Sequence, residues 1–88
     1  MIVKALEKEW DVKDCTRQER RDLHFLNYAI WISGEHDVEA YKTLLDETER
    51  ISGLKDDDFD GISMTDTDVL LQAIFLDYQK VSKKKAGG

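Results

Sequence analysis

The residues whose spacing most resembles a chemical site lie in an acidic stretch in the middle of the chain. In this stretch Asp56, Asp58 and Asp60 stand at alternate positions, and Gly61 follows. This is the order of the first half of an EF-hand calcium loop, where oxygens at alternate positions and a glycine turn surround the ion. The second half differs, because Thr67 stands where a bidentate glutamate is required. An acidic, solvated connection is the favoured interpretation, and a calcium-binding module is the alternative.

A second candidate site is one face of a predicted helix over residues 17–33, which gathers basic and aromatic side chains. Such a face could hold an acidic or aromatic partner, or stack on nucleic acid bases. Alternatively, Trp31 completes the core and the arginines pair with the acidic middle of the same chain. The sequence leaves both interpretations open. The face comprises Arg17, Arg20, Arg21, His24, Tyr28 and Trp31.

No residue pattern typical of catalysis is found in the sequence. There is no glycine-rich phosphate loop, no nucleophile beside a base, and no pair of carboxylates in an apolar setting. His24 and His36 are the only histidines and Cys15 is the only cysteine. These residues do not make up a metal site. We therefore expect a non-enzymatic protein that needs neither a cofactor nor a metal.

Local capping signals predict the elements that position these residues. Thr16–Glu19 and Thr65–Asp68 each have the threonine and acid of a capping box, which marks a helix start. Asp37 is a further predicted N-cap, and Gly34 and Gly53 are predicted helix stops. Combined with the apolar periodicity, the signals predict three helices, over residues 17–33, 38–51 and 66–81.

Residues 1–14 give conflicting signals, since residues 10–12 alternate like a strand while residues 4–9 suit a helix. We expect a short extended segment, with at most one strand, that packs Ile2, Leu6 and Trp10 onto the helices. The predicted fold class is all-α. It is a small single domain, residues 1–81, of three main helices with a short extended or helical N-terminal segment. A flexible basic tail, residues 82–88, follows.

Apolar periodicity also predicts which helix faces are buried. The first helix has apolar residues over half of its circumference, so we expect it to be well buried. The predicted core residues of this helix are Leu23, Phe25, Leu26, Ala29, Ile30 and Ile32; those of the second are Val38, Tyr41, Leu44, Leu45, Thr48 and Ile51; those of the third are Leu70, Leu71, Ile74, Phe75, Tyr78 and Val81.

The third helix carries a second, smaller apolar stripe, formed by Val69, Ala73 and Leu76. Packing on two sides of this helix is therefore predicted. Either the N-terminal segment covers the second stripe, which we favour, or the stripe is a docking groove for another protein. Met64 and Val69 also have the spacing of a hydrophobic staple at the helix start.

Length and charge limit the classes of function. A chain of 88 residues buries only about 60% of the surface that its unfolded form exposes, which favours action at the surface. A single cysteine and the absence of a long apolar run indicate a reducing compartment, no membrane segment and a cytoplasmic location. Residues 35–68 hold twelve acidic and three basic residues, which argues against nucleic acid as a general partner.

Four short stretches, within residues 10–85, combine into a larger pattern: Cys15-Thr16-Arg17-x-Glu19-Arg20-Arg21-x-Leu23-His24-x-x-Asn27, Tyr41-x-x-Leu44-Leu45, Ile51-Ser52-Gly53-Leu54, and Asp68-x-Leu70-Leu71-x-Ala73-Ile74 followed by Tyr78 and a lysine run. In order and size this pattern resembles the small tail assembly chaperones of long-tailed bacteriophages. The resemblance is one of pattern, since that family has no invariant catalytic motif.

The resemblance implies a mostly helical protein that acts in the host cell cytoplasm. Such chaperones bind the long, helix-rich tape measure protein, keep it soluble and help tail tube protein subunits to assemble around it. Self-association is a further option. A small cytoplasmic adaptor or regulator is the alternative function, followed by a calcium- or DNA-binding module. The candidate partner-binding residues, taken from the helical periodicity, are Arg20, His24, Tyr28, Trp31, Val69, Ala73 and Leu76.

Overall fold

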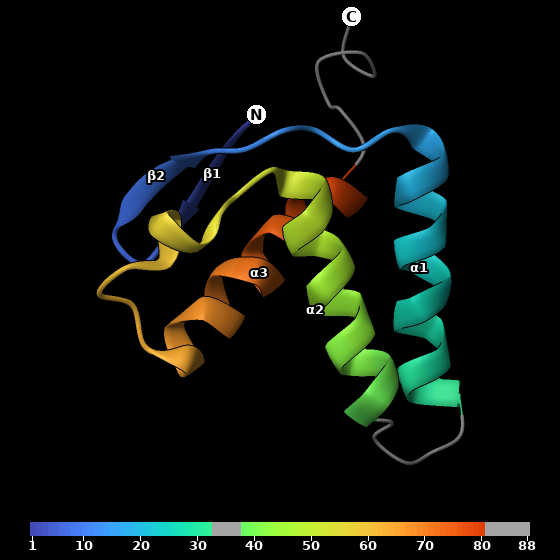
Figure 1. Cartoon of the computed structure of the whole chain (residues 1–88). Coiled ribbons are helices and arrows are strands. Elements are labelled where there is room, and N and C mark those ends of the chain that lie inside the picture. The colour runs from blue at the N-terminus through green and yellow to red at the C-terminus, as the bar shows by residue number, and fades with distance from the viewer. Residues whose placement is uncertain (33–37, 81–88) are drawn as a thin grey trace, which may run out of the picture.

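The computed structural model describes residues 1–32 and 38–80. These residues form two strands, β1 (Ile2–Ala5) and β2 (Lys8–Asp11), the α-helices α1 (Arg17–Ile32), α2 (Val38–Ser52) and α3 (Met64–Gln79), and a 3-10 helix, η1 (Asp56–Phe59) (Figure 1). The fold is therefore mostly α and not all-α, because the N-terminal residues form a β-hairpin. The predicted Gly34 stop, the Asp37 cap, Val81 and the tail over residues 82–88 lie outside the described residues.

The β-hairpin replaces the single extended segment that the sequence predicts. Its strands are antiparallel, and Val3 pairs with Trp10. Successive side chains of a strand point to opposite faces, so Val3 and Trp10 share the face that is buried against the helices. Leu6 is half-buried. Ile2, however, is 53% exposed on the opposite face, so its predicted packing is wrong.

The turn of the hairpin consists of Leu6 and Glu7, which both have positive φ, at 54° and 62°. Two-residue hairpin turns with this backbone normally use Asn-Gly or Asp-Gly, because other residues meet a steric cost there. The turn therefore lacks its usual sequence signal. For this reason the hairpin could not be distinguished from a single extended segment.

Replacing Glu7 by glycine is expected to raise the free energy of unfolding by about 1 kcal/mol, because glycine adopts positive φ without the steric cost. The matched control is Glu9→Gly, at the second residue of β2, which should lower the free energy of unfolding by about 0.5–1 kcal/mol. Urea denaturation followed by circular dichroism measures both changes. A loss of stability in both variants would contradict the turn geometry.

The capping signals at the start of α1 and at the end of α2 are confirmed. The Thr16 hydroxyl accepts a hydrogen bond from the Glu19 N–H (3.1 Å), and the Glu19 carboxylate accepts one from the Thr16 N–H (2.8 Å). This reciprocal pair satisfies amides that the first turn leaves without partners. At the end of α2, Gly53 has a φ of +78°, the left-handed conformation of a helix stop.

The predicted start of α3 is wrong by two residues. The N-cap is Ser63, whose hydroxyl accepts from the Asp66 N–H at 3.1 Å, and not Thr65. The sequence contains two overlapping boxes, and the earlier one is used because Ile62, just before it, packs against the core. Met64 is then the first helical residue and is 81% exposed, so the predicted staple with Val69 does not form.

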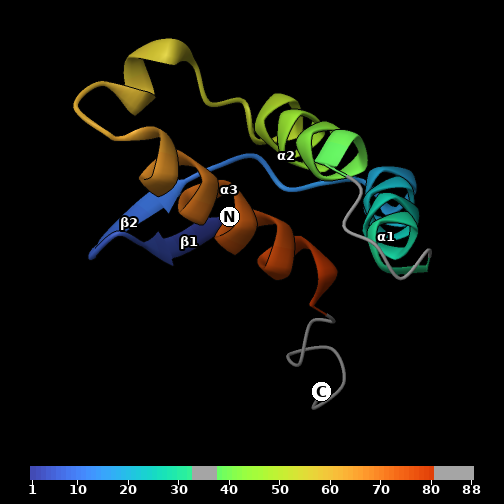
Figure 2. The ribbon, with the colours of Figure 1, turned by 90° about the horizontal axis from the view of Figure 1, so that it is seen from below.

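α3 is the central element of the domain. It runs diagonally between the hairpin and α2, while α1 stands beside α2 at the end of the domain opposite the hairpin (Figures 1 and 2). The described part of the main stripe predicted for α3 is buried, and so is that of α2 except for Val38, which is exposed, and Tyr41, which is half-buried. The buried apolar residues are Val3, Trp10, Val12, Leu23, Ile30, Leu44, Leu45, Ile51, Leu70, Leu71, Ile74, Phe75 and Tyr78.

Lys13, in the connection between β2 and α1, links three parts of the fold through its backbone. Its N–H donates to the Ser52 carbonyl at the end of α2 (2.9 Å). Its carbonyl accepts from the hydroxyl of Tyr78 in α3 (2.6 Å). Because Tyr78 is buried, this connection, which leads into α1 at Arg17, is fixed to the ends of both α2 and α3.

Candidate functional site

The outer face of α1 is the main apolar surface that the fold leaves uncovered on this helix. α1 packs on α2 along its length and touches α3 near one end. One neighbour covers only a narrow arc, so Leu23 and Ile30 are buried and Leu26 is half-buried. The expectation that α1 is well buried is therefore wrong. The remaining residues of its predicted core are exposed, namely Phe25, Ala29 and Ile32.

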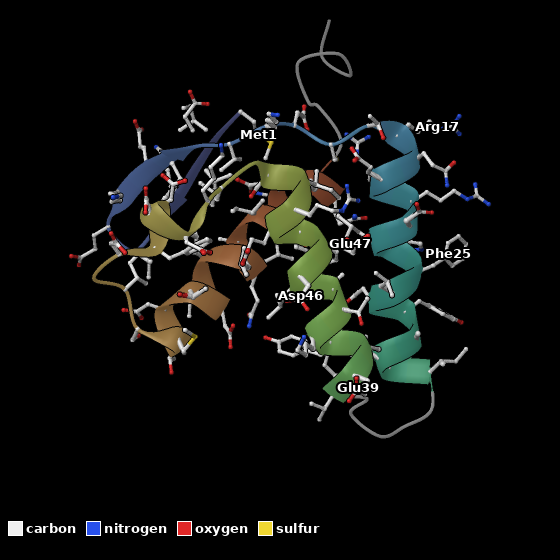
Figure 3. The ribbon with its side chains drawn as sticks, viewed as in Figure 1. Met1, Arg17, Phe25, Glu39, Asp46 and Glu47 are labelled. Atoms are coloured by element: carbon white, nitrogen blue, oxygen red, sulfur yellow. The ribbon has the colours of Figure 1, made fainter. Side chains whose placement is uncertain are left out.

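Aromatic side chains make up the centre of this outer face. Phe25 is 53% exposed, Tyr28 56% and Trp31 60%. In Figure 3 the labelled Phe25 side chain points away from α2. The Trp31 indole N–H donates to the Asn27 side-chain oxygen at 3.3 Å. Trp31 therefore lies on the surface and does not complete the core, which was one of the two open interpretations.

Two arginines extend the outer face toward the start of α1. The Arg21 guanidinium lies over the Phe25 ring, 5.4 Å from its centroid. The His24 ring meets the same Phe25 ring edge-on, with the two ring centroids 5.5 Å apart. Within residues 1–32 and 38–80, neither Arg17 nor Arg21 forms a salt bridge. Among the described residues, the alternative in which these arginines pair with the acidic middle of the chain is therefore not observed.

Arg20 has a structural role and is not available to a partner through the same atoms. Its Nε donates to the Tyr78 carbonyl at 2.7 Å, and the Gln79 side chain donates to the Arg20 carbonyl at 3.1 Å. These two bonds join α1 to the end of α3. Arg20 is half-buried by this contact, which sets it apart from Arg17 and Arg21.

The second apolar stripe of α3, formed by Val69, Ala73 and Leu76, is partly buried and partly exposed. Ala73 is half-buried against the core. Val69 and Leu76 stay exposed, at 45% and 59%, so the N-terminal hairpin does not cover the stripe as expected. The predicted site residues thus come from two helices, which are joined through Arg20 and the end of α3.

The acidic stretch forms the 3-10 helix η1 and the turn after it. The Asp58 carboxylate accepts from the Lys55 N–H at 2.8 Å and so caps this short helix. Gly61 has a φ of +78°. Across residues 1–32 and 38–80, no group of three or more acidic, histidine or cysteine side chains is placed to hold a metal ion.

The residues of this face that were not predicted from the sequence to bind a partner include Phe25, Ile32, Arg17 and Arg21. The available signal was the width of the apolar arc on α1, which is larger than a single neighbouring helix can cover. Of the residues predicted to bind a partner, Tyr28, Trp31, His24, Val69 and Leu76 have exposed side chains.

No helix within residues 1–32 and 38–80 has both the length and the apolar character required to cross a membrane. Comparisons of the chain with protein family models, with curated proteins and with solved structures found no match.

Proposed function

We propose that this protein is a non-enzymatic assembly chaperone that binds an amphipathic helix of a partner protein through the outer face of α1. The observation that carries the proposal is the row of exposed apolar side chains along this helix, Phe25, Tyr28 and Ile32, with Trp31 beside them. Large apolar patches on a small protein are typical of binding surfaces. A helix that presents residues at such spacing pairs well with the apolar stripe of a second helix.

The charges around this face support a partner of a particular kind. Arg17 and Arg21 stand at one end of the apolar row without a salt bridge to the described residues. An acidic side chain of the partner, near one end of its apolar stripe, would pair with them. The net charge of −6, concentrated in the middle of the chain, would keep the complex soluble.

The resemblance to tail assembly chaperones identifies the partner in this proposal as the phage tape measure protein. That protein is long and rich in helices, so it offers many apolar stripes that aggregate when they are uncovered. Covering them until tail tube protein subunits assemble is a task for a surface and needs no catalytic site. The corresponding place of action is the cytoplasm of the host cell.

Co-expression is expected to keep the tape measure protein of the same phage in the soluble fraction. Phe25→Glu and Trp31→Glu should each abolish this effect, because a charge on the row opposes burial against an apolar stripe. Leu76→Glu tests whether the stripe on α3 takes part. The control is Thr65→Glu, which adds the same charge at an exposed position of α3.

All four variants should stay within about 0.5 kcal/mol of the natural protein in free energy of unfolding, as is usual for exposed positions. If Phe25→Glu and Trp31→Glu unfold the domain, these residues belong to the core and the proposal is wrong. If the folded variants still keep the tape measure protein soluble, the small adaptor or regulator becomes the better proposal.

A further inference from the structure

A groove between α2 and α3 forms a second uncovered surface, away from the outer face of α1. Its volume is about 300 Å³. The buried side chains of Leu45 and Leu71 form its floor, and Val38 and Met64 at its edges are 73% and 81% exposed. Figure 1 shows the two helices diverging on this side of the domain. The groove is therefore apolar at the bottom and has an adaptable methionine at its rim.

The walls of the groove carry uncompensated negative charge. Its charged lining residues are Lys42, Asp46 and Glu49 of α2 and Asp68 of α3. Lys42 pairs with Asp46 at 2.8 Å. Glu49 and Asp68 have no salt bridge to any residue in the described ranges.

The electrostatic environment of Glu49 agrees with this count of charges. Partial burial, together with the nearby carboxylates of Asp46 and Asp56, raises the pKa of Glu49 above its usual value. A cation placed in the groove would oppose this rise in pKa, because it would pair with the ionised carboxylate of Glu49 and stabilise it. One wall of the groove is also fixed to the other, since the Gln72 amide of α3 donates a hydrogen bond to the Tyr41 hydroxyl of α2.

We propose that this groove binds a basic amphipathic helix of a partner protein, with an apolar side chain over Leu45 and Leu71 and a lysine or arginine near Glu49 and Asp68. The complementary features are the apolar floor and the net negative rim on two different helices. A small molecule fits less well, because the groove is at the lower limit of ligand pockets in volume and its apolar rim residues are exposed.

This second surface is independent of the proposed function. It lies on different helices and has the opposite charge, so the two surfaces would bind segments of opposite charge. A protein with both could hold two segments, or two partners, at the same time. The experiment can therefore separate the two proposals.

Two synthetic 14-residue helices with the same leucine stripe serve as probes, one with lysine and one with glutamate at all other positions. The full-length protein, labelled with ¹⁵N, is titrated with each peptide and followed by NMR. The leucine–lysine helix should shift amide signals of residues 38–49 and 64–71. The leucine–glutamate helix should shift those of α1. Loss of only the second result counts against the proposed function and leaves the groove proposal standing.

The double substitution of Glu49→Gln with Asp68→Asn should weaken binding of the leucine–lysine helix at least about tenfold. The matched control, Glu9→Gln with Asp57→Asn, removes the same charge from exposed positions elsewhere and should change the affinity less than twofold. Equal losses in the two variants would mean that the peptide follows total charge only, which overturns the proposal. Shifts of the groove signals that grow with protein concentration alone would assign the groove to a second copy of this chain and overturn it as well.

Discussion

Replacing Trp10 by alanine is expected to lower the free energy of unfolding by about 3–5 kcal/mol, the usual cost of removing a buried tryptophan. Trp10 is 6% exposed and its indole N–H donates to the Ala5 carbonyl at 3.0 Å. Since domains of this size are stable by roughly 5–10 kcal/mol, the variant should be partly unfolded at 37 °C. Urea denaturation followed by circular dichroism gives the change directly.

The control for this substitution lies on the other face of the same hairpin. Ile2→Ala should cost less than about 1 kcal/mol, because surface substitutions have small effects and this side chain is exposed. The pair therefore tests the register of the hairpin in addition to its attachment. If Ile2→Ala were the more damaging change, the two faces would be exchanged and Val3 would not be in the core.

Replacing Tyr78 by phenylalanine is expected to cost about 1 kcal/mol at pH 7, because the hydrogen bond to the Lys13 carbonyl is lost. The matched control is Tyr28→Phe, at an exposed position of α1, which should leave the free energy of unfolding unchanged. If both variants were equally stable, the hydroxyl of Tyr78 would contribute nothing to the attachment of the Lys13 connection.

At high pH the same substitution, Tyr78→Phe, should stabilise the protein instead of destabilising it. Burial, with added negative charge from Cys15 and Asp14, raises the pKa of the Tyr78 phenol above its usual value. Above pH 10 the unfolded chain loses this proton while the folded chain keeps it. This group therefore stabilises the fold fully below pH 10, and its contribution falls by up to about 1.4 kcal/mol for each further pH unit.

The phenylalanine variant has no phenol to ionise, so it does not lose stability in this way. Its free energy of unfolding should equal that of the natural protein at about pH 11 and exceed it at higher pH. Both proteins share the effects of their lysines, which cancel in the difference. Urea denaturation of the two proteins between pH 8 and 11.5 provides the comparison. A difference that stays constant over this range would show that Tyr78 ionises equally in the folded and unfolded chains.

The helices of this fold could be predicted from the sequence because their signals are local. The box at Thr16 and the left-handed Gly53 act within a few residues, and both are found where they are expected. The hairpin could not be predicted, because its turn uses Leu6 and Glu7, two residues that normally avoid positive φ. The choice of Ser63 over Thr65 depends on the packing of the residue before it, which is a tertiary effect.

The candidate site was predicted only in part for a related reason. Periodicity identifies the apolar arc of α1, but the number of neighbouring helices decides how much of that arc is covered. Phe25 and Ile32 are exposed because α1 is the outermost helix, a fact of topology. Arg20 has the same residue type and helix face as the other arginines, yet only the position of α3 converts it into a structural contact.

The attachment of the N-terminal residues to α3 has a consequence for synthesis on the ribosome. The bond from Tyr78 to Lys13 joins residues 65 positions apart, and the hairpin packs on the same late helix. α1 and α2 can pair soon after they emerge, since their contacts span a short loop. Val3 and Trp10, although made before the helices, have no place to pack until α3 has been translated. The nascent chain therefore exposes these core residues until α3 has emerged, and β1 and β2 remain open to other proteins during that interval.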